Sequence, residues 1–576
     1  MSVLPYETLP RDYPNRLLSA SVDSADWAQL EPYFLDLQKR PIGSARDLEG
    51  WLTDYSELLT AISEAGAVRY IRTTEQTKDE GYRNAYKAFL EEVEPKVKVG
   101  QFNLNRRYAD SEYRKDLSKQ RYSLLDRRVE NSVRLFREEN VELEKEDSSL
   151  TQKFQELAGS MTAEFEGKER TMQELQKFLE EPDSDLRKRA WSLAERRLLQ
   201  DRERLDEIYD QLVAIRQKIA KNAGFENFRD YAFVKRERFD YSPKDCLRFH
   251  DAIEQHVVPL LREVYAKRKE SLGLDTIRPW DLVADPQGRS PLAPFKSTGD
   301  LVGGCRRVFD KLSPALSRNF ERMASLGLLD LESRPGKAPG GYNAELLQLR
   351  LPFIFTNAVG TDADLRILLH ESGHAFHVFE MRDQDLNYMY RSDNMPAEFA
   401  EVASMSMELL GGEHIEGVFY DRDSAARSRY DHILHITWLL GWIATIDAFQ
   451  HWVYTNPVHT HQQRNEAWVR IHQRFDAGES WDGLEEERAT YWHRQLHLFQ
   501  LPFYYIEYGI AQLGALGVWA RYRRDPEIAV ADYRKALSLG GSRPLPELFE
   551  AAGLPWDFGP ETVRGYAQEL RRILNP

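Results

Sequence analysis

The chain has 576 residues, 42% hydrophobic and 30% charged, which is typical of folded globular proteins and excludes a disordered or fibrous chain. Lysine and arginine number 78 against 93 for aspartate and glutamate, so the formal charge of −15 disfavours nucleic acid and anionic membranes as partners. The two cysteines, Cys246 and Cys305, are too few for a disulfide framework and fit a reducing compartment.

Neither a secretion signal nor a membrane span is predicted. Residues 1–20 carry charges and prolines where a signal needs an apolar stretch, so we expect a cytoplasmic protein. The most apolar span, Ile433–Ile446, contains His435 and is bracketed by Asp431 and Asp447. It is too short and too polar to cross a bilayer, and a buried helix is predicted.

In chain order, helical periodicity with a charged face extends from about Ser24 to Glu180. The segment Glu181–Asp185 contains Pro182 and candidate N-caps, which predicts a boundary between an N-terminal helical domain, 1–185, and the rest of the chain, 186–576. One long helix should follow to about Asn222, with Gly224 as its stop. Further on, Leu346–Asn357 predicts a strand, and Pro352 within it indicates an edge position.

The segment Asp362–Arg382 predicts a helix, capped by Asp362, that contains the HExxH sequence His370-Glu371-Ser372-Gly373-His374. Two histidines one turn apart project from the same face and can hold one zinc ion, with Glu371 close to a metal-bound water. His377 lies another turn along, but a metzincin pattern would need glycine there and histidine at 380. We therefore interpret His377 as a packing or supporting residue.

A catalytic zinc ion needs a third protein ligand, and the next predicted helix, Met395–Leu410, offers glutamates. Glu398, Glu401 and Glu408 share one stripe among largely apolar neighbours, which suggests that their charge is compensated by a cation. The spacing alone does not choose among these three carboxylates.

The chain resembles zinc peptidases of the M3 family, the thimet oligopeptidase and oligoendopeptidase F group, and most of all its bacterial oligoendopeptidase F-like members. The shared stretches follow the family's order and extend over roughly the C-terminal half to two thirds: RPWDL (278–282), GKAPGGY (336–342), LPFIFTNAVGT (351–361), HESGHAFH (370–377), AEVASMSME (400–408) and LSLGGSRPLPELFEAAG (537–553). The resemblance implies that 186–576 is the catalytic zinc-metallopeptidase domain.

By this resemblance Glu401 is the third zinc ligand and Glu408 orients a zinc histidine. Glu401 lies 27 residues after His374, slightly farther than is usual in the family, so Glu398 stays a competitor. The resemblance also makes His497, Tyr505 and Tyr508 donors to the substrate carbonyl as it becomes tetrahedral. Whether Tyr504 or Tyr505 accompanies Tyr508 stays open.

The resemblance implies a mainly α-helical zincin fold of the neurolysin type, with a small β-sheet near the active site and a deep substrate channel. The predicted function is zinc-dependent endopeptidase cleavage of short oligopeptides, with one zinc ion per chain and Glu371 as general base. The strand Leu351–Asn357 could pair with an extended peptide substrate. Two alternatives are a carboxypeptidase or dipeptidyl carboxypeptidase on a related helical fold, and a catalytically silent peptide-binding protein.

Overall fold

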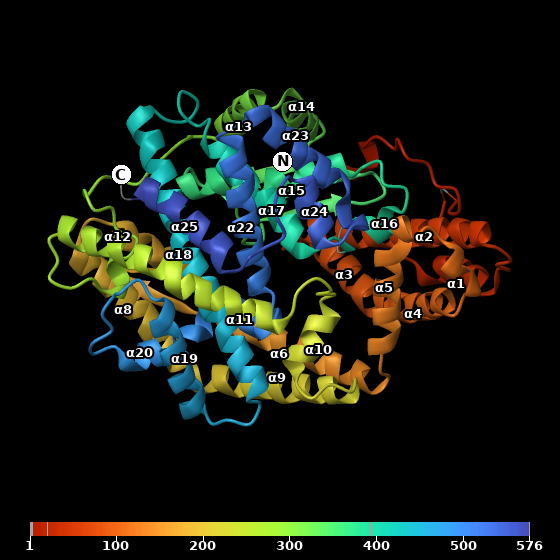
Figure 1. Ribbon diagram of the computed structural model, residues 1–576, viewed down its shortest axis with the longest axis horizontal. Helices are drawn as coiled ribbons and strands as arrows, with labels where there is room; N and C mark the ends of the chain where they lie inside the picture. Colours follow the sequence, from red (N-terminus) through yellow and green to blue (C-terminus); the bar gives the residue numbers. More distant parts are fainter. Residues whose placement is uncertain (1–3, 20, 392–393, 575–576) are drawn as a thin grey trace. The chain divides into compact units, whose positions relative to one another are not determined.

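The protein is mainly helical, and the structure, a computed structural model, describes residues 4–19, 21–391 and 394–574 (Figure 1). By density of contacts the chain divides into two compact units, each assembled from three stretches of sequence. The first unit contains 1–134, 292–429 and 514–556, and the second contains 135–291, 430–513 and 557–576. The boundary predicted near residue 185 stays a prediction.

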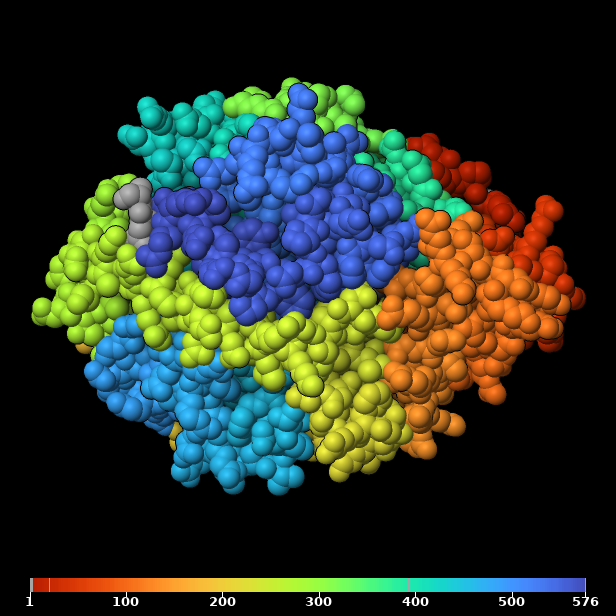
Figure 2. Space-filling model, viewed as in Figure 1, coloured from red at the N-terminus to blue at the C-terminus, as the bar shows by residue number. Residues whose placement is uncertain are grey.

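The first unit begins with a helical layer: α1 (Trp27–Lys39), α2 (Ala45–Glu75), α3 (Glu80–Ala88), α4 (Glu94–Ala109) and α5 (Lys119–Leu135, whose last residue belongs to the second unit). It continues with α13 (Thr298–Leu312), α14 (Pro314–Ser325), β3 (Leu329–Glu332), β4 (Tyr342–Leu346), β5 (Leu351–Ala358), α15 (Asp362–Glu380), α16 (Asn387–Tyr390), α17 (Ala397–Gly412), α23 (Pro526–Ser538) and α24 (Leu545–Ala551). Figure 2 shows two of these distant stretches, 300–325 and 526–556, together at the top of the view.

The second unit contains α6 (Glu139–Gly159), β1 (Thr162–Phe165), β2 (Lys168–Thr171), α7 (Met172–Lys177), α8 (Ser184–Gln200), α9 (Arg202–Asn222), α10 (Phe228–Lys235), α11 (Pro243–Ala252), α12 (Val258–Ser271), α19 (His461–Phe475), α20 (Glu485–Ala489), α21 (Leu496–Gln500) and α25 (Pro560–Leu574). Two long helices, α18 (Arg422–Thr455) and α22 (Tyr505–Tyr522), begin in one unit and end in the other. Each unit therefore depends on segments that are far apart in the sequence.

The predicted long helix after Asp183 is wrong in one respect, because the chain forms two helices there. Asp183 caps α8 through hydrogen bonds from the amides of Asp185 and Leu186, and α9 begins after a break at Asp201. Asp201 leaves helical geometry with φ −105° and ψ 11°, and its carboxylate pairs with Arg197 and Arg204 on either side of the break. Gly224 has φ +85°, so its role as the helix stop is confirmed.

The three-stranded sheet of the first unit has the order β3-β5-β4, with β5 parallel to β3 and antiparallel to β4. The prediction that Leu351–Asn357 is an edge strand is therefore wrong, since β5 is central. Pro352 fits there because the pairing with β3 begins only at Ile354, so Pro352 precedes the part that is flanked on both sides. Among the described residues the outer strands β3 and β4 each have an unpaired edge, whereas β5 from Ile354 onward is paired on both sides and offers no free edge to a substrate.

Helix α18 is the one helix of the described residues that is long and apolar enough to cross a membrane, by length and composition only. Its most apolar stretch is 78% buried within the protein, as expected of a core helix. Ile433, Ile436, Ile443 and Ile446 all lie in the core. The predicted buried helix at Ile433–Ile446 is confirmed and is part of a longer one.

Candidate active site

Helix α15 carries the HExxH sequence, and its start differs by one residue from the prediction. Thr361, and not Asp362, is the N-cap: its hydroxyl accepts from the Asp364 amide, and the Asp364 side chain accepts from the Thr361 amide. Asp362 is instead the first helical residue, and its carboxylate accepts hydrogen bonds from Tyr420 and Ser428. The helix ends at Glu380, with His370 and His374 on one face.

The second helix of the site, α17, lies directly against α15 (Figure 1). Gly373 makes this approach possible, because a Cβ atom there would lie 2.5 Å from both the Ala403 carbonyl oxygen and the Ser404 Cα. The glycine inside the HExxH sequence thus fixes how closely the two helices cross. The crossing brings Glu401 to the histidine pair.

Three potential metal ligands converge at this crossing. One donor atom from each of His370, His374 and Glu401 lies within 4.8 Å of the other two. The Glu401 Oε2 atom is 3.4 Å from His370 Nε2 and 3.6 Å from His374 Nε2. Ligands held at about 2.0–2.1 Å by a tetrahedral zinc ion lie about 3.3–3.4 Å apart, so these donors fit zinc. Glu398 is buried on α17 but is not part of this group.

Glu408 fixes the orientation of His370. Its Oε1 atom is 2.7 Å from His370 Nδ1, so that in the neutral ring the proton lies on Nδ1 and Nε2 is the ligand atom. Burial opposes a charged imidazole here, but the two carboxylates, Glu401 and Glu408, raise the pKa of His370 well above its ordinary value. This contact is the one that the predicted orienting role of Glu408 requires, and the role itself stays a prediction.

The other donors are held in the forms that bind metal. Burial lowers the pKa of His374 to about 4, which keeps its ring neutral. Burial alone would raise the pKa of Glu401, but a hydrogen bond with His370, the proximity of both histidine rings and a hydrogen bond from Ser404 lower it to about 2. Glu401 is therefore a carboxylate, and it also accepts a hydrogen bond of 2.9 Å from Ser404.

Glu371 has the properties of a general base. It is buried, its Oε2 atom has no hydrogen-bond partner in the part of the chain that the structure describes, and burial raises its pKa to about 7. A carboxyl group whose pKa is near 7 can both take and return a proton at physiological pH. The Glu371 backbone carbonyl accepts a hydrogen bond of 3.4 Å from the Asn343 side chain, which connects α15 to the edge strand β4.

His377 lies outside the metal group, in agreement with its interpretation as a packing residue. The ring is 1% exposed, burial lowers its pKa to about 3, and it meets the Phe399 ring edge-on at 6.2 Å. A neutral, buried imidazole in contact with Phe399 contributes packing between α15 and α17.

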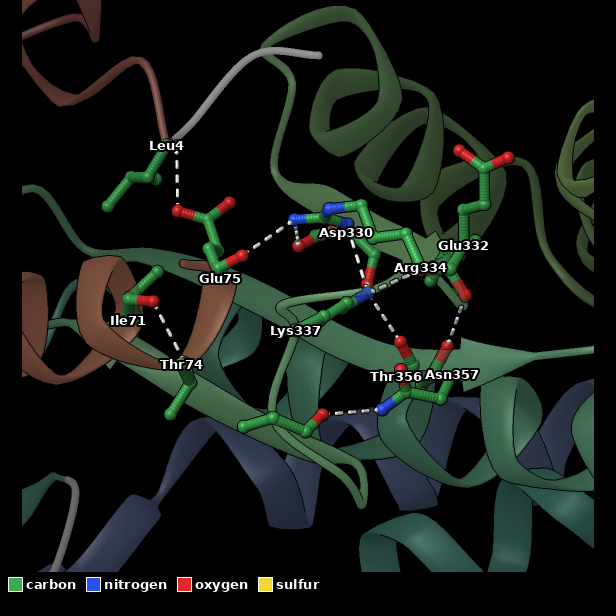
Figure 3. A network of polar contacts seen from close by, with 12 residues as sticks. Leu4, Ile71, Thr74, Glu75, Asp330, Glu332, Arg334, Lys337, Thr356 and Asn357 are labelled. Atoms are coloured by element: carbon green, nitrogen blue, oxygen red, sulfur yellow. Dashed lines mark hydrogen bonds and ion pairs between the residues drawn. The ribbon is translucent and has the colours of Figure 1, made fainter. Parts of the chain in front are cut away.

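The GKAPGGY segment (336–342) is bonded through Lys337 to the sheet beside α15 (Figure 3). The fully buried ammonium group donates to the backbone oxygens of Asp330, Glu332 and Thr356 and pairs with the Asp330 carboxylate at 3.0 Å. Asn357 donates to the carbonyls of Ala338 and Gly340 at 2.9 Å. The loop that leads into β4 is therefore fixed to the adjoining ends of β3 and β5.

His497, Tyr505 and Tyr508 lie in the second unit and form one aromatic cluster. The His497 ring centroid is 4.8 Å from that of Tyr505 and 5.9 Å from that of Tyr508, and both contacts are edge-on. Tyr504 belongs to the same cluster, 5.1 Å from Tyr508 and 6.1 Å from His497, so the choice between Tyr504 and Tyr505 stays open. Burial raises the pKa of Tyr505 to about 12, which keeps its hydroxyl a donor.

Gln495 was not predicted and orients this cluster. The Trp442 indole, which can only donate, donates to Gln495 Oε1 at 3.0 Å, so the amide nitrogen faces His497 Nδ1 at 2.8 Å. His497 Nδ1 must then accept, and a neutral ring carries its proton on Nε2. Nothing in the sequence near Gln495 or Trp442 signals this role, because it depends on the approach of α18 to the residue that precedes α21, and the two are far apart in the sequence.

A mainly helical chain in which an HExxH helix crosses a glutamate helix defines the class of helical metallopeptidases. The chain belongs to Peptidase family M3: residues 177–558 match that family, and residues 20–136 match the Peptidase M3 N-terminal domain. The family resemblance and the mainly helical fold with small sheets are thus confirmed. The protein is an oligopeptidase hydrolase of the oligoendopeptidase-like type.

Solved structures agree over nearly the full length. PZ peptidase A with inhibitor 2 is 30% identical, covers 99% of both chains and superposes with a TM-score of 0.87. A protein provisionally assigned as oligoendopeptidase F is 30% identical over 98% of this chain and 99% of its own, also with a TM-score of 0.87. Another with the same provisional assignment, from Bacillus anthracis strain Ames, is 26% identical over 98% of both chains with a TM-score of 0.83. The search of curated proteins gives no match.

Proposed function

We propose that the protein is a zinc-dependent endopeptidase that hydrolyses internal bonds of short oligopeptides. The observation that carries the proposal is the convergence of His370, His374 and Glu401 beside the unpaired Oε2 atom of Glu371. His370, His374 and Glu401 would hold one zinc ion. When bound, zinc supplies Lewis acidity, which lowers the pKa of a coordinated water and polarises the substrate carbonyl.

Glu371 acts as general base and then as general acid. Its carboxylate takes a proton from the attacking water and returns it to the leaving amine, for which its pKa of about 7 is suited. His497, through Nε2–H, and the hydroxyls of Tyr505 and Tyr508 donate hydrogen bonds to the developing oxyanion.

The edge strand β4 is the candidate for peptide pairing, in place of β5. Its outer edge is unpaired in the sheet, it contacts α15, and Asn343 on it donates to the backbone of Glu371. An extended peptide that adds to this edge would gain backbone hydrogen bonds along its length. Such binding selects flexible peptides over folded proteins.

The general base is tested with Glu371→Gln, which keeps the size of the side chain but cannot take a proton. We expect full zinc content by elemental analysis and loss of nearly all hydrolysis of a quenched peptide. Full activity in this variant would refute the mechanism. Cleavage inside a peptide with a blocked C-terminus, read by mass spectrometry, distinguishes an endopeptidase from a carboxypeptidase or dipeptidyl carboxypeptidase.

The ligand assignment is tested by a matched pair of variants on α17. Glu401→Ala should lose zinc and activity together, whereas Glu398→Ala should retain zinc, because Glu398 is outside the donor group. If the two results are exchanged, the third ligand lies one turn earlier in the helix.

A further inference from the structure

A second cluster of metal-ligand side chains lies in the second unit, between helices α11 and α18. Cys246 and His250 are four residues apart on α11, and Asp447 and His451 are four residues apart on α18, so each helix presents both side chains on one face. One donor atom from each of Cys246, Asp447 and His451 lies within 4.8 Å of the other two. The donor atoms of His370, His374 and Glu401 in the active site lie within the same distance of one another.

The cluster is closed to solvent and has unsatisfied polar atoms. Cys246 and Asp447 are 0% exposed, His250 is 1% exposed and His451 is 4% exposed. Among the described residues, Asp447 Oδ1, His250 Nδ1 and His451 Nδ1 have no hydrogen-bond partner, and His451 Nε2 makes only a longer contact of 3.3 Å with Asp447 Oδ2. Buried polar atoms are nearly always paired in folded proteins, so the unpaired atoms of Asp447 and His451, grouped with the Cys246 thiol, leave positions that a metal ion could fill.

We propose that Cys246, Asp447 and His451 bind a second divalent metal ion, Zn²⁺, with a structural role. A thiolate and a carboxylate supply two negative charges, which a divalent ion neutralises, and burial of these charges is otherwise unfavourable. His451 Nε2 lies 3.3 Å from Asp447 Oδ2, the separation of two ligands on a tetrahedral zinc ion. Sulfur and imidazole donors favour zinc over magnesium or calcium.

His250 forms a hydrogen bond with Asp447, one of the proposed ligands. Its Nε2 atom is 2.8 Å from Asp447 Oδ2, and this hydrogen bond fixes the carboxylate as outer partners of metal ligands commonly do. Its ring stands edge-on to that of His451, with centroids 5.6 Å apart. The four side chains thus connect two helices whose sequence positions are about 200 residues apart.

A third grouping in the same unit differs because an arginine lies within it. His472, Asp476 and Glu479 also converge, but the Arg488 guanidinium is 2.8 Å from Asp476 and 3.3 Å from His472 Nδ1. Arg488 therefore already supplies a cation to that cluster. Among the described residues no lysine or arginine pairs with Asp447 in this way, and its partners are the two histidines.

Cobalt substitution tests the proposal, because only the second site contains sulfur. The zinc of the full-length protein is removed with a chelator and replaced by Co²⁺, and the absorption spectrum is recorded. We expect a thiolate-to-cobalt charge-transfer band in the near ultraviolet, which the His370, His374 and Glu401 donors cannot produce. His374→Ala should keep this band and should retain about one zinc ion per chain of the about two in the wild-type protein.

The variants Cys246→Ser and Cys305→Ser form a matched pair, since both thiols are fully buried. Cys246→Ser should lose the band and about one zinc ion, while Cys305→Ser should keep both. A band that survives Cys246→Ser would overturn the proposal. If Cys246→Ser does not fold, the wild-type protein and His374→Ala still test the second site. A zinc content of one ion per chain in the wild-type protein refutes the second site. The absence of the charge-transfer band from both proteins also refutes it. Neither result bears on the catalytic zinc, which activity and Glu401→Ala report.

Discussion

The substitution Gly373→Ala tests whether the crossing of α15 and α17 sets the geometry of the active site. The added Cβ would lie 2.5 Å from Ala403 O and Ser404 Cα, both backbone atoms of a buried helix that cannot move singly. To reach 3.4 Å, where ordinary contact begins, the helices must separate by about 0.9 Å. Because the histidines lie on α15 and Glu401 on α17, this separation also moves the ligand donors apart.

The expected effects on stability and activity differ in size. Overpacking costs about 1–3 kcal/mol, and replacement of a helical glycine by alanine recovers about 1 kcal/mol, so unfolding should become easier by about 0–2 kcal/mol. A misplacement of about 1 Å at a catalytic centre can cost about 10²-fold in rate. We therefore expect kcat/KM for a quenched peptide to fall about 10²-fold, with weaker zinc binding.

Gly50→Ala is the matched control. Gly50 also lies inside a helix of the first unit, α2, but a Cβ there would meet nothing within 4 Å. We expect unchanged activity and a stability gain of about 0.5–1 kcal/mol. If Gly373→Ala matches this control in peptide hydrolysis and zinc affinity, the close crossing does not fix the site and the reasoning is refuted.

Three further predictions concern residues that support the site or its unit. Glu408→Ala should weaken zinc binding about 10–100-fold, measured by competition with a chromophoric chelator, since it frees the His370 ring; unchanged affinity would contradict this role. Gln495→Leu should lower kcat about 10–100-fold with little change in KM, because His497 loses the partner that fixes its proton on Nε2; a wild-type kcat would exclude that role. Burial raises the pKa of Glu75 to about 7, so the stability contributed by its neutral carboxyl is present below the ordinary glutamate pKa and is lost as pH rises through about 7. The free energy of unfolding, measured in urea, should fall between about pH 5 and 8 by up to about 3 kcal/mol more in the wild-type protein than in Glu75→Gln. The same pH dependence of this free energy in both proteins would disprove the prediction.

Local features of the active site could be predicted from the sequence. Residues four positions apart in a helix share a face, so the HExxH sequence alone predicts the histidine pair and the adjacent base. The stripe on the next helix likewise predicts that its glutamates face a common partner. The choice among them depends on the depth and angle at which α15 and α17 cross, and Gly373 sets these through a contact between helices.

Features that depend on contacts far apart in the sequence were missed or wrong. Pro352 suggested an edge strand, but the start of the β3 pairing, two residues further on, decides how proline fits in β5. The break at Asp201 has no proline or glycine to signal it, and ion pairs on both sides accommodate it. The role of Gln495 is visible only in the folded protein, where the Trp442 indole of α18 donates a hydrogen bond to it.

The two proposed metal clusters differ in access, and this difference assigns their roles. The side chains of His370 and His374 keep 24% and 22% of their surface exposed, whereas Cys246 and Asp447 have none. A catalytic ion must admit water and substrate, while a structural ion is enclosed by the protein. The sulfur ligand fits the enclosed site as well, because an exposed thiolate would be oxidised whereas a buried one is protected. Chelation should therefore stop catalysis before it loosens α11 from α18, and the interval between the two events measures how firmly the second ion is held.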